Sequence, residues 1–331
     1  MLAVILNRHS IKRKGENRKN VKPHIPPHSI TGQGILFIRR MGFPALKRMS
    51  VYFNKKEELK EKATSHTKMM EAGFKDEIEE CVKNTKTYGG DGIAVAAAAK
   101  KEDEFDLAGD TETTETAKPV IIVDKLDSVK SAIQHRDGKT AVLNFASYKN
   151  PGGKFMEGSS AQEECLCHAS TLYNVLKQFP VYYQWNRVHN NRALYTNRAL
   201  YSEDVIFLDD SVCVYGAEPE QVKIDVITCA APNFSAAGKY ARVEVDENNA
   251  ELLRRIKFVL DVAEENKVQT LILGAFGCGV FGQDAAVVAK YFKKCLDTYN
   301  YHFKTVYFSI LNRGRSDNYA KFKSIFRLKE S

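Results

Sequence analysis

The sequence lacks long hydrophobic runs. No segment approaches the roughly 18 uninterrupted apolar residues that a membrane-spanning helix needs. Apolar residues make up 44% and charged residues 27% of the 331 residues, which is ordinary usage for a globular chain that can bury a substantial core. We therefore expect no membrane partner.

Paired cysteine motifs are also absent. The seven cysteines form no C-x-x-C pair and show no zinc-binding spacing. An odd count without a pattern suits a reducing compartment, so we expect an intracellular protein, cytoplasmic or nuclear. Cys165, Cys167 and His168 are close in sequence, but Cys165 and Cys167 would point in different directions on a helix. No metal site is therefore predicted there.

Acidic residues are scarce only at the beginning of the chain. Residues 1–48 contain eleven Lys or Arg and one acid, whereas the remaining residues hold 38 bases and 40 acids. The net charge of +8 thus belongs to a tail and does not indicate that the whole chain binds polyanions. Lys12–Lys14 could form a nuclear-import or nucleic-acid patch, so nucleic acid is expected as a partner only through this tail. A disordered or transit-like tail, or a functional start at Met49, are the alternatives.

Composition divides the chain into three predicted regions. Residues 1–48 form the basic, disordered tail. Residues 49–117 form a helical accessory region, in which charged helices over 55–83 are divided at Gly73 and an acidic surface loop follows at 102–117. Residues 118–331 form the core. Its strands alternate with helices, which predicts an α/β fold with a mostly parallel sheet and helices on both faces.

The elements of the core are predicted from periodicity. The predicted strands cover 120–123, 141–145, 224–228, 269–273 and 305–310, and the predicted helices cover 127–134, 162–178, 250–266, 284–300 and 319–326. Asp127 and Asp284 are the expected helix caps. Residues 181–204, which contain NRALY twice, are predicted to be a long surface loop or hairpin that walls a ligand cleft.

Two glycine loops follow predicted strands, where ligands bind in open α/β sheets. The first contains Gly152-Gly153. The second, Gly274–Gly282, contains Gly-x-Gly-x-x-Gly from Gly277, but too late in the sheet for a dinucleotide fingerprint and without the Lys-Ser/Thr of a P-loop. Such loops let backbone N–H groups approach a diphosphate, or simply make a tight turn around core phenylalanines.

Two adjacent carboxylates, Glu163 and Glu164, open the helix after the first loop. Ser160 and Glu163 fit a capping box, and acids in a first helical turn are favoured by the helix dipole. Glu164 lies about 100° further round the helix, so capping does not explain it. Because burial under a ligand and a neighbouring carboxylate favour the protonated form of a carboxyl group, Glu164 is a candidate proton donor or a member of a structural network.

The segment NFASYKNPGGKFMEGSSAQEECLCHASTLY strongly resembles the glycine-loop and Gln-Glu-Glu motif of the microbial-type poly(ADP-ribose) glycohydrolases. ITCAAPNF and LILGAFGCGVFGQDA resemble later segments of that family, in the same order. The resemblance implies a three-layer αβα macrodomain-like fold with a mixed sheet and an N-terminal helical extension. It also implies a hydrolase that needs no metal or cofactor and acts on poly(ADP-ribose) or ADP-ribosylated proteins. Lys154 departs from the family, which has a third loop glycine there.

By this resemblance, Glu164 is the catalytic acid and Glu163 orients the ribose beside the scissile bond. The two loops would embrace the diphosphate and the distal ribose, with Phe281 ordering the reacting sugar. The remaining substrate-binding residues implied are Asn144, Gly152, Gly153, Gln162, Gly277, Cys278, Gly279 and Val280. Lys154 would either crowd the ligand or add a phosphate contact.

The expected reaction is hydrolysis of ribose–ribose O-glycosidic bonds, with one glutamate acting in both proton transfers. Two related functions remain open from the sequence. One is a mono-ADP-ribosyl hydrolase, and the other is a module that binds ADP-ribose without cleaving it. A dinucleotide-dependent oxidoreductase rests only on the late glycine pattern.

Overall fold

The computed structural model describes residues 43–95, 117–209, 219–311 and 316–326. Of the unit formed by residues 1–52, only helical backbone from Phe43 is described, and the unit of residues 53–331 carries the features below. Residues 1–42 of the predicted tail and residues 102–116 of the predicted acidic loop lie outside the described residues. No helix in the described ranges is long and apolar enough to cross a membrane.

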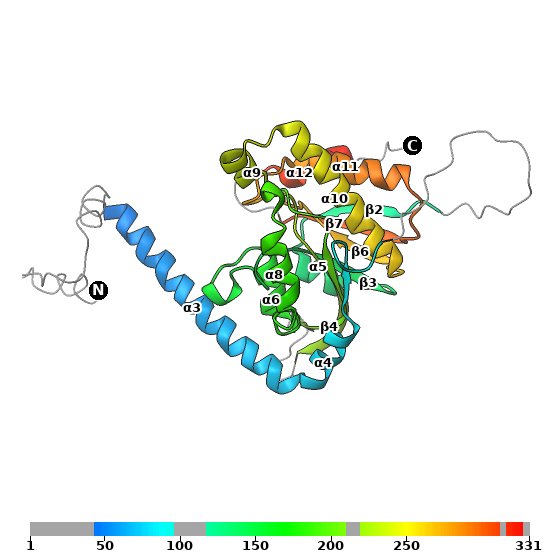
Figure 1. Cartoon of the computed structure of the whole chain (residues 1–331). Helices are drawn as coiled ribbons and strands as arrows, with labels where there is room; N and C mark the ends of the chain where they lie inside the picture. The colour runs from blue at the N-terminus through cyan, green and yellow to red at the C-terminus, as the bar shows by residue number, and fades with distance from the viewer. Residues whose placement is uncertain (1–42, 96–116, 210–218, 312–315, 327–331) are drawn as a thin grey trace, which may run out of the picture. The chain divides into compact units, whose positions relative to one another are not determined.

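One seven-stranded mixed sheet forms the centre of the fold, with the strand order β1-β4-β5-β3-β6-β7-β2 (Figure 1). The strands are β1 (Lys86–Tyr88), β2 (Val120–Asp124), β3 (Thr140–Phe145), β4 (Ala199–Asp209), β5 (Glu220–Cys229), β6 (Thr270–Leu273) and β7 (Thr305–Ser309). β3 pairs in parallel with β5 and β6, and β7 pairs in parallel with β6 and β2. β4 is antiparallel to β5 and to the short edge strand β1, which the sequence pattern missed.

Helices cover both faces of this sheet. Successive strand residues point to opposite sides, and because apolar residues occur on both sides, each face packs against its own layer of helices. On β3, Ala141 and Leu143 pack with α10 (Val245–Glu265), α11 (Ala285–Thr298) and α12 (Asn318–Ile325). Val142, between them, packs with the opposite layer. That layer contains α4 (Lys75–Asn84), α5 (Ser128–Gln134), α6 (Gln162–Ala169), α7 (Leu172–Leu176) and α8 (Pro180–Val188). Figure 1 shows α10 and α11 on the other side of the strands from α6 and α8. The three-layer αβα prediction is confirmed.

Local signals placed several helix ends correctly. α3 (Phe43–Gly73) ends at the predicted division, and α4 begins at Lys75. Asp127 accepts a hydrogen bond from the Lys130 amide at the start of α5. Asp284 accepts from the amides of Ala286 and Val287 at the start of α11. These caps form because a short carboxylate can satisfy amides that have no partner in the first helical turn.

The prediction of one helix over 162–178 is wrong, because the chain breaks between α6 and α7. Ser170 is extended (φ −154°, ψ 176°) and forms an isolated bridge with Phe207 of β4. The Thr171 amide donates to the Ile206 carbonyl at 2.9 Å. A backbone hydrogen bond to β4 thus replaces the helical hydrogen bond of the Thr171 amide, which no local sequence signal indicated.

The prediction of a long surface loop over 181–204 is also wrong at both ends. The first part is α8, which begins at Pro180 and buries Tyr182, Tyr183 and Asn186. The last part enters β4, whose first four residues are buried. Only residues 189–198 connect the two elements, and they include the short helix η2 (Asn191–Ala193). Tyr and Asn are weak helix formers, so packing rather than propensity decided this segment.

The core generates a stability prediction. Phe292 of α11 is fully buried, and its ring centroid lies 5.3 Å from that of Phe308 on β7. We expect Phe292→Ala to lower the free energy of unfolding by about 3–5 kcal/mol, through lost burial and the cavity it leaves. Urea unfolding of the variant checks this, with Lys293→Ala, a partly exposed neighbour, as the control. A loss below about 1 kcal/mol would contradict the packing described here.

Candidate active site

A cavity of about 400 Å³ lies between the loop that follows β3 and the loop that follows β6. β3 and β6 are parallel neighbours, so their carboxyl ends bring both glycine loops to the same edge of the sheet. The volume is within the range of small-ligand sites. Of the predicted residues, Gly153, Gln162, Glu163, Glu164, Gly277, Gly279, Val280 and Phe281 line this cavity.

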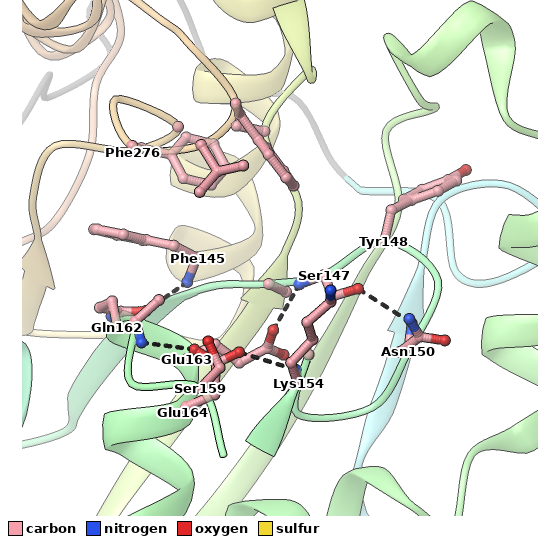
Figure 2. A pocket seen from close by; sticks show the side chains of 18 of the residues that line it. Phe145, Ser147, Tyr148, Asn150, Lys154, Ser159, Gln162, Glu163, Glu164 and Phe276 are labelled. Carbon is pink, nitrogen blue, oxygen red and sulfur yellow. Dashed lines mark hydrogen bonds between the residues drawn. The ribbon is translucent and has the colours of Figure 1, made fainter. Parts of the chain in front are cut away.

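The carboxylate of Glu163 is buried on the floor of this cavity and is held from two sides. Its Oε2 accepts from the Ser147 amide at 2.7 Å (Figure 2), and its Oε1 accepts from Asn144 Nδ2 at 3.3 Å. The side chain is 4% exposed. Asn144 is fully buried below the cavity, and its Oδ1 has no partner among the described residues. Asn144 therefore positions Glu163 rather than lining the cavity itself.

The carboxylate of Glu164 is held by backbone amides. Its Oε1 accepts from the Lys154 amide at 2.9 Å, and its Oε2 accepts from the Ala161 amide at 2.8 Å. The predicted capping box of Ser160 and Glu163 is therefore wrong. Ala161 is the N-cap, and Glu164, three residues on, returns to its amide. Glu164, which the predicted capping box does not explain, is therefore the glutamate that caps the helix.

Burial separates the two glutamates from bulk water. Desolvation raises the pKa of Glu163 to about 8, even though the Ser147 amide favours the charged form, and the neighbouring charge of Glu164 adds to the rise. Near neutral pH, Glu163 therefore keeps its proton inside the cavity.

The first loop requires glycine at two positions but not at the third. Gly152 and Gly153 have φ of +63° and +60°. A Cβ on Gly153 would lie 2.7 Å from an oxygen of each glutamate, and one on Gly152 would lie 2.7 Å from the ring of Tyr173. Lys154 has φ −113°, which any residue adopts. The lysine therefore costs no backbone strain, and its exposed side chain lines the cavity (Figure 2).

The amides of the first loop are largely used within the protein. The Gly153 amide donates to the Asn150 carbonyl, and the Lys154 amide donates to Glu164. In the second loop, the amides of Gly279, Val280 and Phe281 donate to no acceptor among the described residues, while the Gly282 amide donates to the Gly279 carbonyl. Consecutive unpaired N–H groups form an anion-binding concavity. The second loop is thus the better source of donors for a phosphate.

Besides Asn144, three further predicted residues differ from the prediction in how they relate to the cavity. Gly152 and Cys278 lie outside its lining. Gln162 lines it, but its side chain is engaged elsewhere, since it accepts from the Phe145 amide at 2.8 Å and donates to the Leu143 carbonyl at 2.8 Å. Gln162 therefore fixes the end of β3 beside the glutamates.

Tyr148 and Tyr195 form an aromatic wall of the cavity together with the predicted Phe281. The sequence predicts a cleft wall within 181–204 but singles out neither tyrosine. Tyr195 stacks on Tyr148, with ring centroids 4.1 Å apart, and Phe281 meets Tyr195 edge-on at 6.2 Å. All three residues line the cavity. The near-repeat NRALY was the available signal, but it did not distinguish Tyr195 from Tyr201, which is fully buried in β4.

No cluster of three or more His, Cys, Asp or Glu side chains that could hold a metal ion occurs in the part of the chain that the structure describes. Cys165 is exposed whereas Cys167 is fully buried on α6. The two thiols therefore face different environments.

Comparisons with known proteins agree on one family. The family model described as "Microbial-type PARG, catalytic domain", where PARG stands for poly(ADP-ribose) glycohydrolase, matches residues 54–210. The PARG structure from Thermomonospora curvata is 26% identical with a TM-score of 0.67, and the match covers 82% of this chain and all of that one. The PARG from Deinococcus radiodurans in complex with ADP-ribose is 33% identical with a TM-score of 0.56, over 63% of this chain and 84% of that one. A search of curated proteins found no match.

The pair of glutamates generates a prediction about pH. Because the pKa of Glu163 is raised in the folded state from 4.5 to about 8, its contribution to stability is fully present below pH 4.5 and is lost as the pH rises towards 8. We expect the free energy of unfolding to fall across this window with a slope of up to about 1.4 kcal/mol per pH unit, and Glu163→Gln to flatten it.

Urea unfolding at several pH values between 5 and 8 checks this prediction. Glu79→Gln, an exposed substitution on α4, is the matched control and should keep the slope of the wild type. Equal slopes for Glu163→Gln and the wild type would show that Glu163 does not hold the proton.

Proposed function

This chain belongs to the microbial-type poly(ADP-ribose) glycohydrolases, and we infer that it hydrolyses the ribose–ribose O-glycosidic bonds of poly(ADP-ribose), releasing ADP-ribose. The observation that carries this inference is the buried pair of Glu163 and Glu164 in a cavity between two glycine loops. A buried carboxyl group that keeps its proton near neutral pH, beside a second carboxylate, provides what acid-assisted cleavage of a glycosidic bond needs.

In the proposed complex, one ADP-ribose unit occupies the cavity. Its diphosphate would accept hydrogen bonds from the unpaired amides of Gly279, Val280 and Phe281, which supports placing the negative charge at the second loop. The ring of Phe281, braced edge-on by Tyr195, would pack against the reacting ribose. Glu163, fixed by the Ser147 amide, would hold a ribose hydroxyl beside the scissile bond.

The proposed chemistry uses the proton that Glu163 holds, which passes to the adjacent carboxylate of Glu164. Glu164 donates it to the leaving glycosidic oxygen while the bond from that oxygen to the anomeric carbon breaks. Positive charge develops on the anomeric carbon and is stabilised by the neighbouring diphosphate. The Glu164 carboxylate then removes a proton from water as the water oxygen bonds to the anomeric carbon. The proton balance is restored, and the product is ADP-ribose.

Substitution of Glu164 tests its role. Glu164→Gln keeps the shape and one hydrogen-bond acceptor but cannot transfer a proton. We expect it to lower kcat on poly(ADP-ribose) at least about 100-fold, the low end for loss of a general acid–base, while ADP-ribose still binds. Release of ADP-ribose from labelled polymer gives the rate, and calorimetry gives the affinity.

Glu163→Gln is the matched comparison, because it makes the same substitution at the adjacent glutamate of the pair. We expect its main effects on KM and on the pH profile, since Glu163 would orient the sugar and bears the raised pKa. Retained turnover in Glu164→Gln together with its loss in Glu163→Gln would reverse the two roles. If the wild-type protein binds the polymer but does not cleave it, the proposed hydrolase activity is contradicted.

Phe281 provides a second test of the proposed complex. Phe281→Ala should lower kcat about 100-fold, because a sugar held loosely spends less time in the reactive geometry. Steady-state kinetics on polymer measure this. Tyr240→Ala, which deletes an exposed aromatic side chain on α9 (Phe234–Ala241), is the control. Equal kinetics for Phe281→Ala and the control would remove Phe281 from the site.

A further inference from the structure

Four charged side chains line the cavity among the described residues: Glu163, Glu164, Lys149 and Lys154. The carboxylates are buried on the floor, whereas both lysine side chains are exposed. Neither ammonium nitrogen lies within 4.0 Å of a carboxylate oxygen among the described residues. The cavity therefore has a negative floor and two cations with no protein counter-ion at its edge.

The backbone of Lys154 holds its side chain beside the reaction centre. Its amide donates to Glu164 Oε1, and its carbonyl accepts from the amides of Glu157 and Ser159 at 3.0 and 3.1 Å. The residue before it is Gly153, where a Cβ would lie 2.7 Å from an oxygen of each carboxylate. Lys154 is therefore anchored at the end of the cavity where Glu164 would meet the glycosidic oxygen.

The backbone amides of the first loop are largely engaged and leave few donors for an anion. The amides of Gly153 and Lys154 are engaged within the protein, and those of Lys149 and Asn150 point to Ser147 Oγ at 3.4 and 3.2 Å. Arg187 of α8 donates to Asn150 Oδ1 at 3.4 Å and adds a third cation at this loop. A glycine at position 154 would leave the loop with fewer groups able to contact an anion.

We propose that Lys149 and Lys154 bind a diphosphate of poly(ADP-ribose), which makes them specificity determinants for the polymer. This rests on the proposed function and adds the substrate contact that the first loop makes. An ammonium group forms strong charge-assisted hydrogen bonds with phosphate oxygens. Because Lys154 stands where the bond to the next unit is cut, the diphosphate of that next unit, on the leaving side, is the one within its reach.

The experiment compares polymer with ADP-ribose, which lacks the next unit. Lys154→Met and Lys149→Met remove the charge and keep most of the side-chain stem, and Lys154→Arg keeps the charge. We expect each Met variant to raise KM for linear poly(ADP-ribose) about tenfold, as for loss of one charge-assisted contact, with ADP-ribose affinity within about twofold of wild type. Lys154→Arg should stay close to wild type, and the differences should shrink at high salt.

Lys75→Met, on the exposed side of α4, is the matched control for removal of one surface charge. If the Met variants lose ADP-ribose affinity by the same factor as their KM for polymer rises, the lysines contact the diphosphate of the bound unit. That result would contradict their role as specificity determinants for the polymer. Unchanged or improved KM and ADP-ribose affinity in Lys154→Met and Lys154→Gly would overturn the proposal, because the lysine would then only be solvated or would crowd the substrate. If wild-type protein does not cleave polymer, the proposed function fails separately, and direct polymer binding by the same variants still tests the lysines.

Discussion

The structure around the cavity depends on the burial of two adjacent carboxylates at the start of α6. A carboxyl group removed from water must receive hydrogen bonds or keep its proton, and this site uses both solutions. Glu163 and Glu164 accept from the amides of Ser147, Lys154 and Ala161, which belong to the loop that follows β3. The loop conformation and the ionisation of Glu163 are therefore set together. Gly153 has no room for a side chain, because a Cβ there would lie 2.7 Å from an oxygen of each carboxylate.

The opposite wall of the cavity depends on a second buried charge. Arg255 of α10 is fully buried and donates to the carbonyls of Ala230 and Leu194 and to Asn197 Oδ1. These contacts fix the segment that presents Tyr195 to the cavity. Tyr195 itself has φ +64°, an unusual conformation for a bulky residue. Nothing near Tyr195 in the sequence specifies this arrangement, since Arg255 lies 60 residues further along the chain.

The N-cap of α6 lies one residue later than the predicted capping box places it, and this shift changes which glutamate caps the helix. The sequence predicted a helix N-terminus within one residue, but successive helical side chains are about 100° apart. Moving the cap from Ser160 to Ala161 exchanges the two glutamates, so that Glu164 returns to the cap amide and Glu163 enters the desolvated position with the raised pKa. Both glutamates still line the cavity after this shift, but each has the environment that the capping argument had given to the other.

The near-repeat NRALY separates what the sequence determined from what the tertiary structure decided. Periodicity and glycine placement were enough for most of the alternating strands and helices and for the positions of the two glycine loops, whereas the roles of Gln162–Glu164 came from the resemblance to a family. The five letters of NRALY were not enough for their own conformation. Asn191–Tyr195 contains four residues with positive φ, whereas the second copy runs into β4, where Ala199–Tyr201 is buried. Identical side chains adopt different backbones because the second copy enters β4 and pairs with β5, whereas the first copy has no strand partner among the described residues. Arg255 contacts both copies, through the Leu194 carbonyl and Asn197 Oδ1, and β5 and Arg255 are both distant from them in sequence.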